Sequence, residues 1–239
     1  MRIIFSTYTD AGMVRETNQD SIFAAANGEY GLFAAADGMG GHFCGEIASR
    51  RITTALKEWW DSFISEPCGF EECYEELRSL LCRINSEIYG EYSQNGRICG
   101  STAAVLFIFG GRYIVMNSGD TRIYSRRWIN IRQESTDHTY GREAVISGIM
   151  TKAEAKLSVD RDKLTSAVGC YSELKLNALS APLDRTGFFI CTDGVYKYCG
   201  SLFTAVSMFM KEPCDLIAYK VKKRGAADNY SFITIRILK

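Results

Sequence analysis

Hydrophobic and polar positions follow two different periods along the chain, and they predict strands and helices in separate blocks. Three apolar runs of strand length open the sequence, RIIFSTY, SIFAAA and YGLFAAA. The Asn27–Gly28 dipeptide stands between the second and third runs and predicts a tight hairpin. We therefore expect three strands at the start of the chain, with the last two paired as a hairpin.

Two amphipathic helices are predicted next. Apolar residues recur at helical spacing between Gly45 and Pro67, and again from Phe70 to Ile88, with charged residues on the opposite face. Trp59 and the other aromatic residues of these segments are expected to pack in the core rather than to line a ligand site.

The middle of the chain is strongly β. Short turns separate four further runs, STAAVLFIF, RYIVMNS, TRIYSR and WINIRQ. Such spacing is typical of an antiparallel meander. The first of these runs is apolar on both faces, so we expect it to be covered on both sides.

The remaining pattern completes an α+β fold. Residues 134–162 are polar and irregular, with one helical stretch, MTKAEAKL, and are expected to form a mobile flap. Strands are predicted for LKLNALSA and GFFICT, helices for roughly 194–223, and a last strand for NYSFITIRIL. The order of these blocks predicts stacked sheets sandwiched by helix pairs. Nothing marks a linker, so one domain is expected over 1–239.

Composition argues against several classes of protein. The 28 basic and 28 acidic side chains cancel, which gives no support for binding nucleic acid. Nine cysteines without a CxxC pair favour reduced thiols over disulfides or a zinc site. No signal segment and no apolar stretch of membrane-spanning length is evident, so a cytoplasmic protein without membrane contact is expected.

Aspartates recur where predicted strands begin or end. Each one alone is more often a turn or helix-cap residue than a ligand. Strand ends can meet at one rim of a sheet, however, and several carboxylates close together need cations to stay ionised. Oxygen ligands alone suit Mg²⁺ or Mn²⁺, and the presence of only two histidines weakens zinc chemistry. The aspartates in such settings are Asp10, Asp20, Asp37, Asp120, Asp193 and Asp228.

Eight short motifs appear in an order that resembles the metal-dependent protein phosphatase family, type 2C, in its bacterial form. They are NQD, DGMGGH, GSTA, NSGDTRIY, TDH, LTSAVG, TDG and DN, and they run from about Asp10 to Thr234. The resemblance implies a four-layered α/β/β/α sandwich with two mostly antiparallel central sheets. It also implies two divalent metal ions, Mn²⁺ or Mg²⁺, at one edge of those sheets.

The resemblance assigns a role to individual residues of the motifs. Asp37 would bridge both metals, with the Gly38 carbonyl on the first. Asp193 and Asp228 would hold the second metal. Arg15 would bind the substrate phosphate, a role that suits a planar bidentate donor. Two further aspartates have expected roles: Asp20 orients waters on the first metal and Asp120 binds a third, weaker metal.

The sequence departs from the family pattern in several places. Gln19 stands where many members have Glu, and Thr121 where Ser is usual. The segment before TDH and the flap that follows are unusual, which leaves substrate choice and the third metal open. Met39 occupies the place of the general-acid histidine proposed in eukaryotic members, so no general acid is assigned. His42 and His138 are expected to have packing or supporting roles.

Three functions fit the motifs. The first is hydrolysis of phosphoserine and phosphothreonine in proteins by a water that bridges two metals, opposing a Ser/Thr kinase. The second is a catalytically silent binding module, which the presence of Asp37, Asp193 and Asp228 disfavours. The third is a phosphatase for small metabolites, which the sequence leaves open. A monomer is expected.

Overall fold

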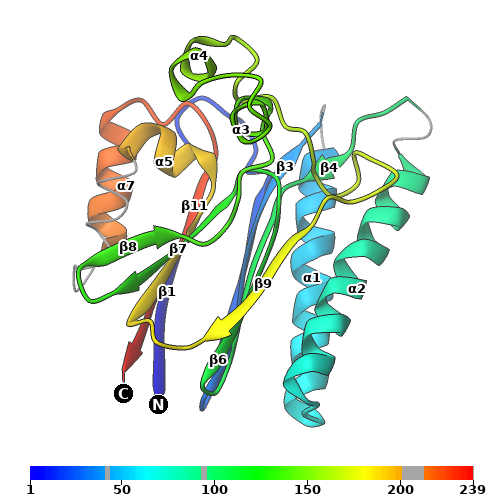
Figure 1. Ribbon diagram of the computed structural model, residues 1–239, viewed down its shortest axis with the longest axis vertical. Helices are drawn as coiled ribbons and strands as arrows, with labels where there is room; N and C mark the ends of the chain where they lie inside the picture. The colour runs from blue at the N-terminus through cyan, green and yellow to red at the C-terminus, as the bar shows by residue number, and fades with distance from the viewer. Residues whose placement is uncertain (41–43, 93–95, 201–212, 239) are drawn as a thin grey trace.

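Two antiparallel sheets lie face to face in the computed structural model, which describes residues 1–40, 44–92, 96–200 and 213–238 (Figure 1). The first sheet has the order β1 (Arg2–Asp10), β11 (Tyr230–Leu238), β10 (Gly187–Cys191), β7 (Arg122–Arg127), β8 (Asn130–Gln133). The second has the order β2 (Asp20–Asn27), β3 (Tyr30–Met39), β5 (Ala103–Phe109), β6 (Arg112–Ser118), β9 (Asn177–Pro182). The short β4 (Gly100–Ser101) pairs with the end of β3.

Helices cover the outer face of each sheet. The long helices α1 (Cys44–Ser65) and α2 (Phe70–Glu91) lie on the second sheet, and α5 (Asp193–Cys199) and α7 (Pro213–Lys223) lie on the first (Figure 1). Two short helices, α3 (Tyr140–Ile146) and α4 (Lys152–Leu157), stand at one end of the sandwich. The predicted α/β/β/α sandwich is therefore confirmed.

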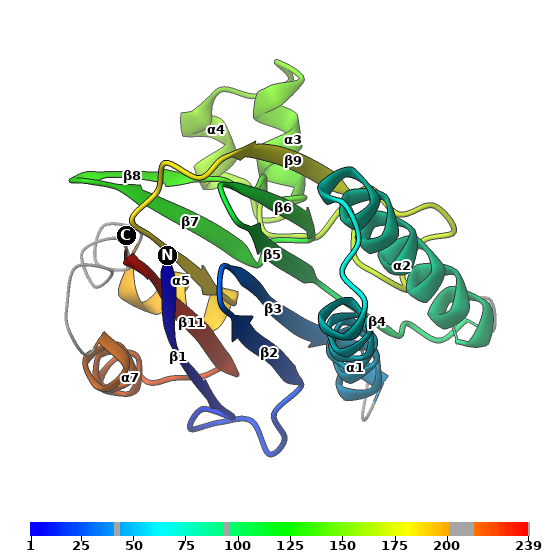
Figure 2. The same cartoon turned by 90° about the horizontal axis from the view of Figure 1, so that it is seen from below.

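Strand β5 lies at the centre of the second sheet and is buried on both faces, as its sequence predicts. Ala103, Val105 and Phe107 pack toward α1 and α2, whereas the alternate residues pack between the sheets. Figure 2 shows the strand between its neighbours, with the helix pair on one side and the first sheet on the other. Because successive side chains of a strand point to opposite faces, a run without polar residues requires a double cover.

The meander prediction is wrong at one turn. Strands β5 and β6 pair, and β7 and β8 pair, but β6 and β7 belong to different sheets. The chain crosses between the sheets at Gly119, which has φ +92°. A Cβ atom on Gly119 would lie 2.6 Å from the Thr102 side chain, so the crossing requires a residue without one. The crossing places Asp120 at the edge that both sheets share.

Other local expectations have mixed outcomes. The hairpin between β2 and β3 is confirmed, with Gly28 and Glu29 as its two turn residues. The flap contains α3 as well as the expected helix, which begins at Lys152 after a capping box formed by Thr151 and Glu154. Part of the expected C-terminal helical region, 201–212, lies outside the described residues.

The cysteines are free, as predicted: all nine are unpaired thiols, and only Cys82 is exposed. Among the described helices, none is both long and apolar enough to cross a membrane.

The aromatic cluster under α1 provides a test of this packing. The Phe107 ring lies 5.2 Å from Trp59 and 5.3 Å from Phe63 between ring centroids, and the residue is fully buried. We expect Phe107→Ala to lower the free energy of unfolding in urea by about 3–5 kcal/mol, because a large cavity replaces the ring. The exposed Ile129, changed to Ala, serves as the control and should stay within about 0.5 kcal/mol of wild type. Equal effects of the two changes would contradict the packing.

Candidate metal and phosphate site

The strand ends of both sheets meet at one edge, and this brings the motif aspartates together. In the β2–β3 hairpin, Asp20 lies opposite Asp37. In the other sheet, Cys191 at the end of β10 pairs with the first residue of β7 on one side and with β11 on the other. The residues just beyond these ends are Asp120, Asp193 and Asp228. The antiparallel register therefore collects carboxylates that are up to about two hundred positions apart in sequence.

A pocket of about 740 Å³ opens at this edge. Asp20 lies beneath the pocket, where it is buried and does not contribute to the lining. The structure thus places every predicted site residue at the pocket or directly below it. Those that line the pocket are Arg15, Asp37, Gly38, Asp120, Asp193 and Asp228. Asp10, in contrast, pairs with Lys222 at 2.9 Å and is not part of the lining.

Backbone contacts fix Asp37 at the end of β3. Its N–H donates to the Thr102 hydroxyl at 2.9 Å, and its carbonyl accepts from the Thr102 N–H and the Ser101 hydroxyl at 2.9 and 3.0 Å. The next residue must be glycine, because a Cβ on Gly38 would lie 2.3 Å from the Gly45 carbonyl oxygen. The close approach of α1 to the strand end thus leaves the backbone beside Asp37 bare.

The buried side chain of Asn229 ties the loop that carries Arg15 to the start of β11. Its amide nitrogen donates to the carbonyls of Ala11 and Thr17, each at 2.9 Å. Its amide oxygen accepts from the Gln19 N–H at 2.9 Å. One side chain therefore closes a loop of about ten residues over the edge of the sheets.

Burial and mutual repulsion raise the pKa values of the carboxyl groups. Burial raises the pKa of Asp20 to about 7, with the charges of Asp193 and Asp228 adding to the effect. The pKa of Asp37 is raised well above its usual value by burial and by the charge of Asp20. Burial and the charge of Asp193 raise the pKa of Asp120 to about 6. These groups resist ionisation together unless positive charge is supplied.

Two cationic side chains of the protein supply part of that charge. Arg15 forms a bidentate pair with Asp228, with distances of 2.9 and 3.3 Å. The Lys197 ammonium lies 2.6 Å from Asp193, one helical turn away in α5. Among the described residues, no group of three histidine, cysteine or carboxylate side chains is already arranged to hold an ion. Asp228 and Asp193 are thus each already paired with a cationic side chain of the protein.

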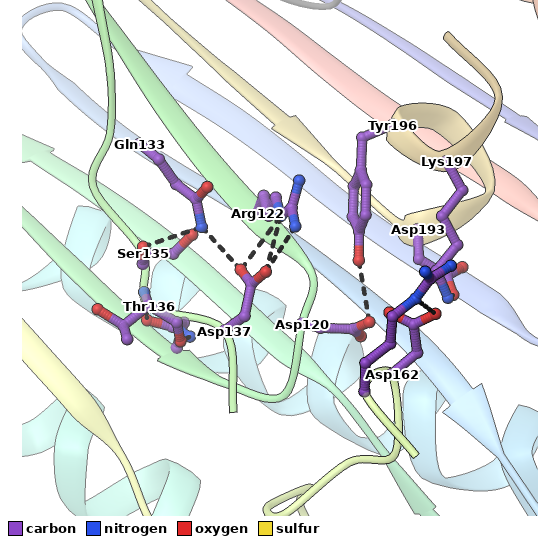
Figure 3. A network of polar contacts seen from close by, with 12 residues as sticks. Asp120, Arg122, Gln133, Ser135, Thr136, Asp137, Asp162, Asp193, Tyr196 and Lys197 are labelled. Carbon is purple, nitrogen blue, oxygen red and sulfur yellow. Dashed lines mark hydrogen bonds and ion pairs between the residues drawn. The ribbon is translucent and has the colours of Figure 1, made fainter. Parts of the chain in front are cut away.

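A chain of contacts connects Asp120 with the TDH motif (Figure 3). The buried Tyr196 donates its hydroxyl to Asp120 at 2.9 Å, and the Arg122 guanidinium lies 3.6 Å from the centre of the Tyr196 ring. Arg122 in turn forms a bidentate pair with Asp137 of the TDH motif, at 2.6 and 3.0 Å to one carboxylate oxygen and 3.1 Å to the other. Gln133 donates to the same carboxylate at 2.7 Å.

The residues fit a site for hard divalent cations. The donor set consists of carboxylate and carbonyl oxygens, the ligands that Mg²⁺ and Mn²⁺ prefer. Oδ2 of Asp20 accepts from the Thr192 hydroxyl at 3.0 Å. Oδ1 is buried and has no hydrogen-bond partner among the described residues. An unpartnered buried carboxylate oxygen is costly, and a hydrated cation beside it would satisfy it.

Several residues of the site were missed by the sequence reasoning. Lys197 carries a detectable signal, because it follows Asp193 by four positions on a helix. Tyr196 and Asn229 carry none, since their partners are distant in sequence. Asp162 reaches the pocket from the flap, as Figure 3 shows, and no local pattern indicates this.

His138 is not part of the pocket lining. His138 supports the base of the flap, where its Nδ1 accepts from the Gly119 N–H at 3.1 Å. His42 lies outside the described residues.

Comparison with known proteins agrees with this architecture. The model of the family "Protein phosphatase 2C" matches residues 13–220. The serine/threonine phosphatase stp of Listeria welshimeri is 24% identical over 238 residues, which cover 95% of this chain and 93% of that protein. The serine/threonine protein phosphatase PstP of Mycobacterium tuberculosis is 31% identical over 196 residues, covering 80% of this chain and 36% of that protein.

Two solved structures of phosphatases named PstP share the fold. The crystal structure of the Mycobacterium tuberculosis serine/threonine phosphatase PstP superposes with a TM-score of 0.86 and 25% identity, covering 99% of both chains. The catalytic domain of a serine/threonine protein phosphatase PstP in complex with two manganese ions gives a TM-score of 0.77 and 24% identity, again over 99% of both chains. The chain therefore belongs to the protein phosphatase 2C family. It is a serine/threonine protein phosphatase.

The Asn229 anchor leads to a testable prediction. We expect Asn229→Ala to lower the free energy of unfolding by about 2–3 kcal/mol, because three hydrogen bonds are lost. Amide hydrogens over residues 11–19 should exchange faster, since the loop loses its attachment to β11. Hydrogen-exchange mass spectrometry measures this directly, with Asn130→Ala at the exposed start of β8 as the control. Unchanged exchange over 11–19 would show that Asn229 does not hold the loop.

The raised pKa of Asp20 predicts how the metal-free protein responds to pH. A carboxyl group whose pKa is raised by folding binds more protons in the native state, so stability falls as pH rises from about 4 to about 7. In chelator, the thermal midpoint should therefore be lower at pH 7.5 than at pH 5.5. The Asp20→Asn variant should lose part of this difference. A variant whose midpoint falls as much as that of wild type would refute the assignment.

Proposed function

We propose that this phosphatase hydrolyses phosphoserine and phosphothreonine in proteins at the pocket lined by the motif aspartates. The observation that carries the proposal is the convergence of carboxylates on one pocket together with a paired arginine at its mouth. In this assignment Asp37 and the Gly38 carbonyl hold the first of two Mn²⁺ or Mg²⁺ ions. Asp37, Asp193 and Asp228 hold the second, and Asp20 orients waters on the first. Asp120 contributes to a third, weaker site.

When bound, the two cations supply a water of lowered pKa and positive charge for the phosphate oxygens. The remaining tasks belong to the protein. Asp37 and Asp193 are held at strand ends whose register does not change, so the nucleophile and the phosphorus can be aligned for in-line attack. No nucleophilic side chain is required, since water attacks the phosphorus directly.

Arg15 binds and orients the phosphate. Its guanidinium is half-exposed at the mouth of the pocket and pairs with Asp228 through two nitrogens. A fork of this kind matches two phosphate oxygens as well as it matches a carboxylate. In the proposed reaction, the guanidinium would donate to the substrate phosphate with the nitrogens that now contact Asp228.

The chain acts as one catalytic unit over 1–239, with residues 134–162 as a flap beside the pocket. Asp162, the last residue of this segment, and the adjacent Lys163 contribute to the lining, so substrate choice depends on the flap. The substrates are phosphorylated proteins, namely a Ser/Thr kinase or its targets, so the phosphatase opposes that kinase. The protein works as a cytoplasmic monomer in this proposal.

The assignment predicts a loss of activity in Asp37→Asn and Asp193→Asn. Hydrolysis of p-nitrophenyl phosphate and of a phosphothreonine peptide should require Mn²⁺ or Mg²⁺ and stop with chelator. Each variant should lose at least about 10²–10³-fold in kcat/KM, because charge that stabilises the transition state is removed. Calorimetry should show weaker Mn²⁺ binding in both.

The exposed Asp61→Asn on α1 is the matched control and should behave as wild type. Full activity in either site variant would exclude its aspartate from the metal site. A folded wild-type protein without turnover would favour the binding-module alternative. Turnover of small phosphate esters without turnover of the peptide would favour a metabolite phosphatase.

A further inference from the structure

A second cavity adjoins the phosphate pocket. It has a volume of about 480 Å³ and is lined mainly by apolar and aromatic side chains. Met39, Lys163 and Leu164 line both cavities, so the two share a wall. A further hollow between α1 and α2 has no lining residue in common with the phosphate pocket. The second cavity is therefore placed where a substrate that extends beyond its phosphate would pass.

The walls of the second cavity are firmly built. The buried Asn85 of α2 accepts from the Gly169 N–H at 2.8 Å and donates to the Tyr171 carbonyl at 3.0 Å. Ser101 and Val168 pair through two backbone hydrogen bonds of 2.9 and 2.8 Å. These contacts fix the segment that carries the cavity residues to both α2 and β4.

A close contact between two sulfur atoms lies where the two cavities meet. Cys170 Sγ lies 3.7 Å from Met39 Sδ, and Met39 stands two residues after Asp37 on β3. On the outer side, Ile98 and Tyr171 are 66% and 44% exposed, so two apolar side chains face solvent at the opening. Exposed apolar surface next to an active site is typical of a place where a ligand packs.

The charges at the opening suit an anionic polypeptide. Arg97 and Lys163 line the cavity, and within the described part of the chain neither forms an ion pair. Cations without partners beside an apolar hollow favour a ligand that carries negative charge next to an apolar group. A phosphorylated polypeptide has both features.

We propose that the second cavity binds an apolar side chain of the substrate protein close to the phosphorylated residue. This inference rests on the proposed function, because it assumes that the phosphate occupies the first cavity. A leucine or phenylalanine side chain matches the lining, since a cavity of roughly 150 Å³ already holds a benzene ring. Ile98 and Tyr171 are then specificity-determining residues, and neither contacts the reacting atoms.

The test compares phosphothreonine peptides that carry Leu or Ala at each of the three positions on either side of the phosphoresidue. In wild type, Leu at one position should lower KM about tenfold relative to Ala, because a filled apolar pocket discriminates by this amount. The value of kcat should change little, since the contact is the same in ground and transition states. Ile98→Asp and Tyr171→Ala should reduce the preference to less than twofold.

Hydrolysis of p-nitrophenyl phosphate, which fits the first cavity alone, should remain unchanged in both variants. Ile129→Asp is the matched control, because Ile129 is 83% exposed and lies outside both the flap and the cavity lining. Since Ile98 is exposed, its variant should fold, and a thermal melt checks this. If Tyr171→Ala fails to fold, Ile98→Asp decides the outcome.

A wild-type enzyme that hydrolyses all peptides with equal KM would overturn the inference and leave the proposed function intact. So would a leucine preference that survives in Ile98→Asp, or a loss of p-nitrophenyl phosphate hydrolysis in a folded variant. If light scattering shows that Ile98→Asp converts a dimer to a monomer, the surface is instead a contact between copies. Wild type that hydrolyses no substrate with Mn²⁺ would reject the proposed function itself.

Discussion

Crowding of buried carboxylates at one edge of two stacked sheets is the constraint on which the rest of this structure depends. Burial alone makes an ionised Asp20 or Asp37 unfavourable, and each neighbouring charge adds to the cost. The β-sandwich tolerates this because the strands that present these groups are held on both faces by apolar layers. A cation that binds between these carboxylates offsets the cost of ionising them, and this contributes to its binding free energy.

The crossing between the sheets is the second requirement for the site. Had β6 and β7 formed a hairpin, Asp120 would lie in a turn of one sheet and would not face the other. The positive φ of Gly119 allows the chain to change sheets within three residues. A side chain at this position would collide with Thr102. Thr102 also accepts from the Asp37 N–H, so one threonine shapes both the crossing and the end of β3.

Local pattern in the sequence was enough for the fold class, the order of most elements and the set of aspartates. Alternation and helical spacing act over a few residues, and the strands and the long helices follow from them. The sheet exchange after β6 could not be seen, because a glycine–aspartate turn reads the same in a hairpin and in a crossing. The contacts of Asn229 and Tyr196 join segments far apart in the chain, and no single-sequence signal reports such pairs. The short helix α3 was missed because its few residues show too little periodicity.

In the proposed assignment, the pair between Arg15 and Asp228 would link two binding events. An ion bound by Asp228 would weaken the attraction between this carboxylate and the Arg15 guanidinium, and the guanidinium could then pair with another anion. If that anion is the substrate phosphate, metal and substrate would each raise the affinity for the other, by the same factor in both directions. With neither ligand bound, the Arg15 guanidinium is already neutralised by Asp228, so this arginine would attract other anions less strongly than an unpaired one.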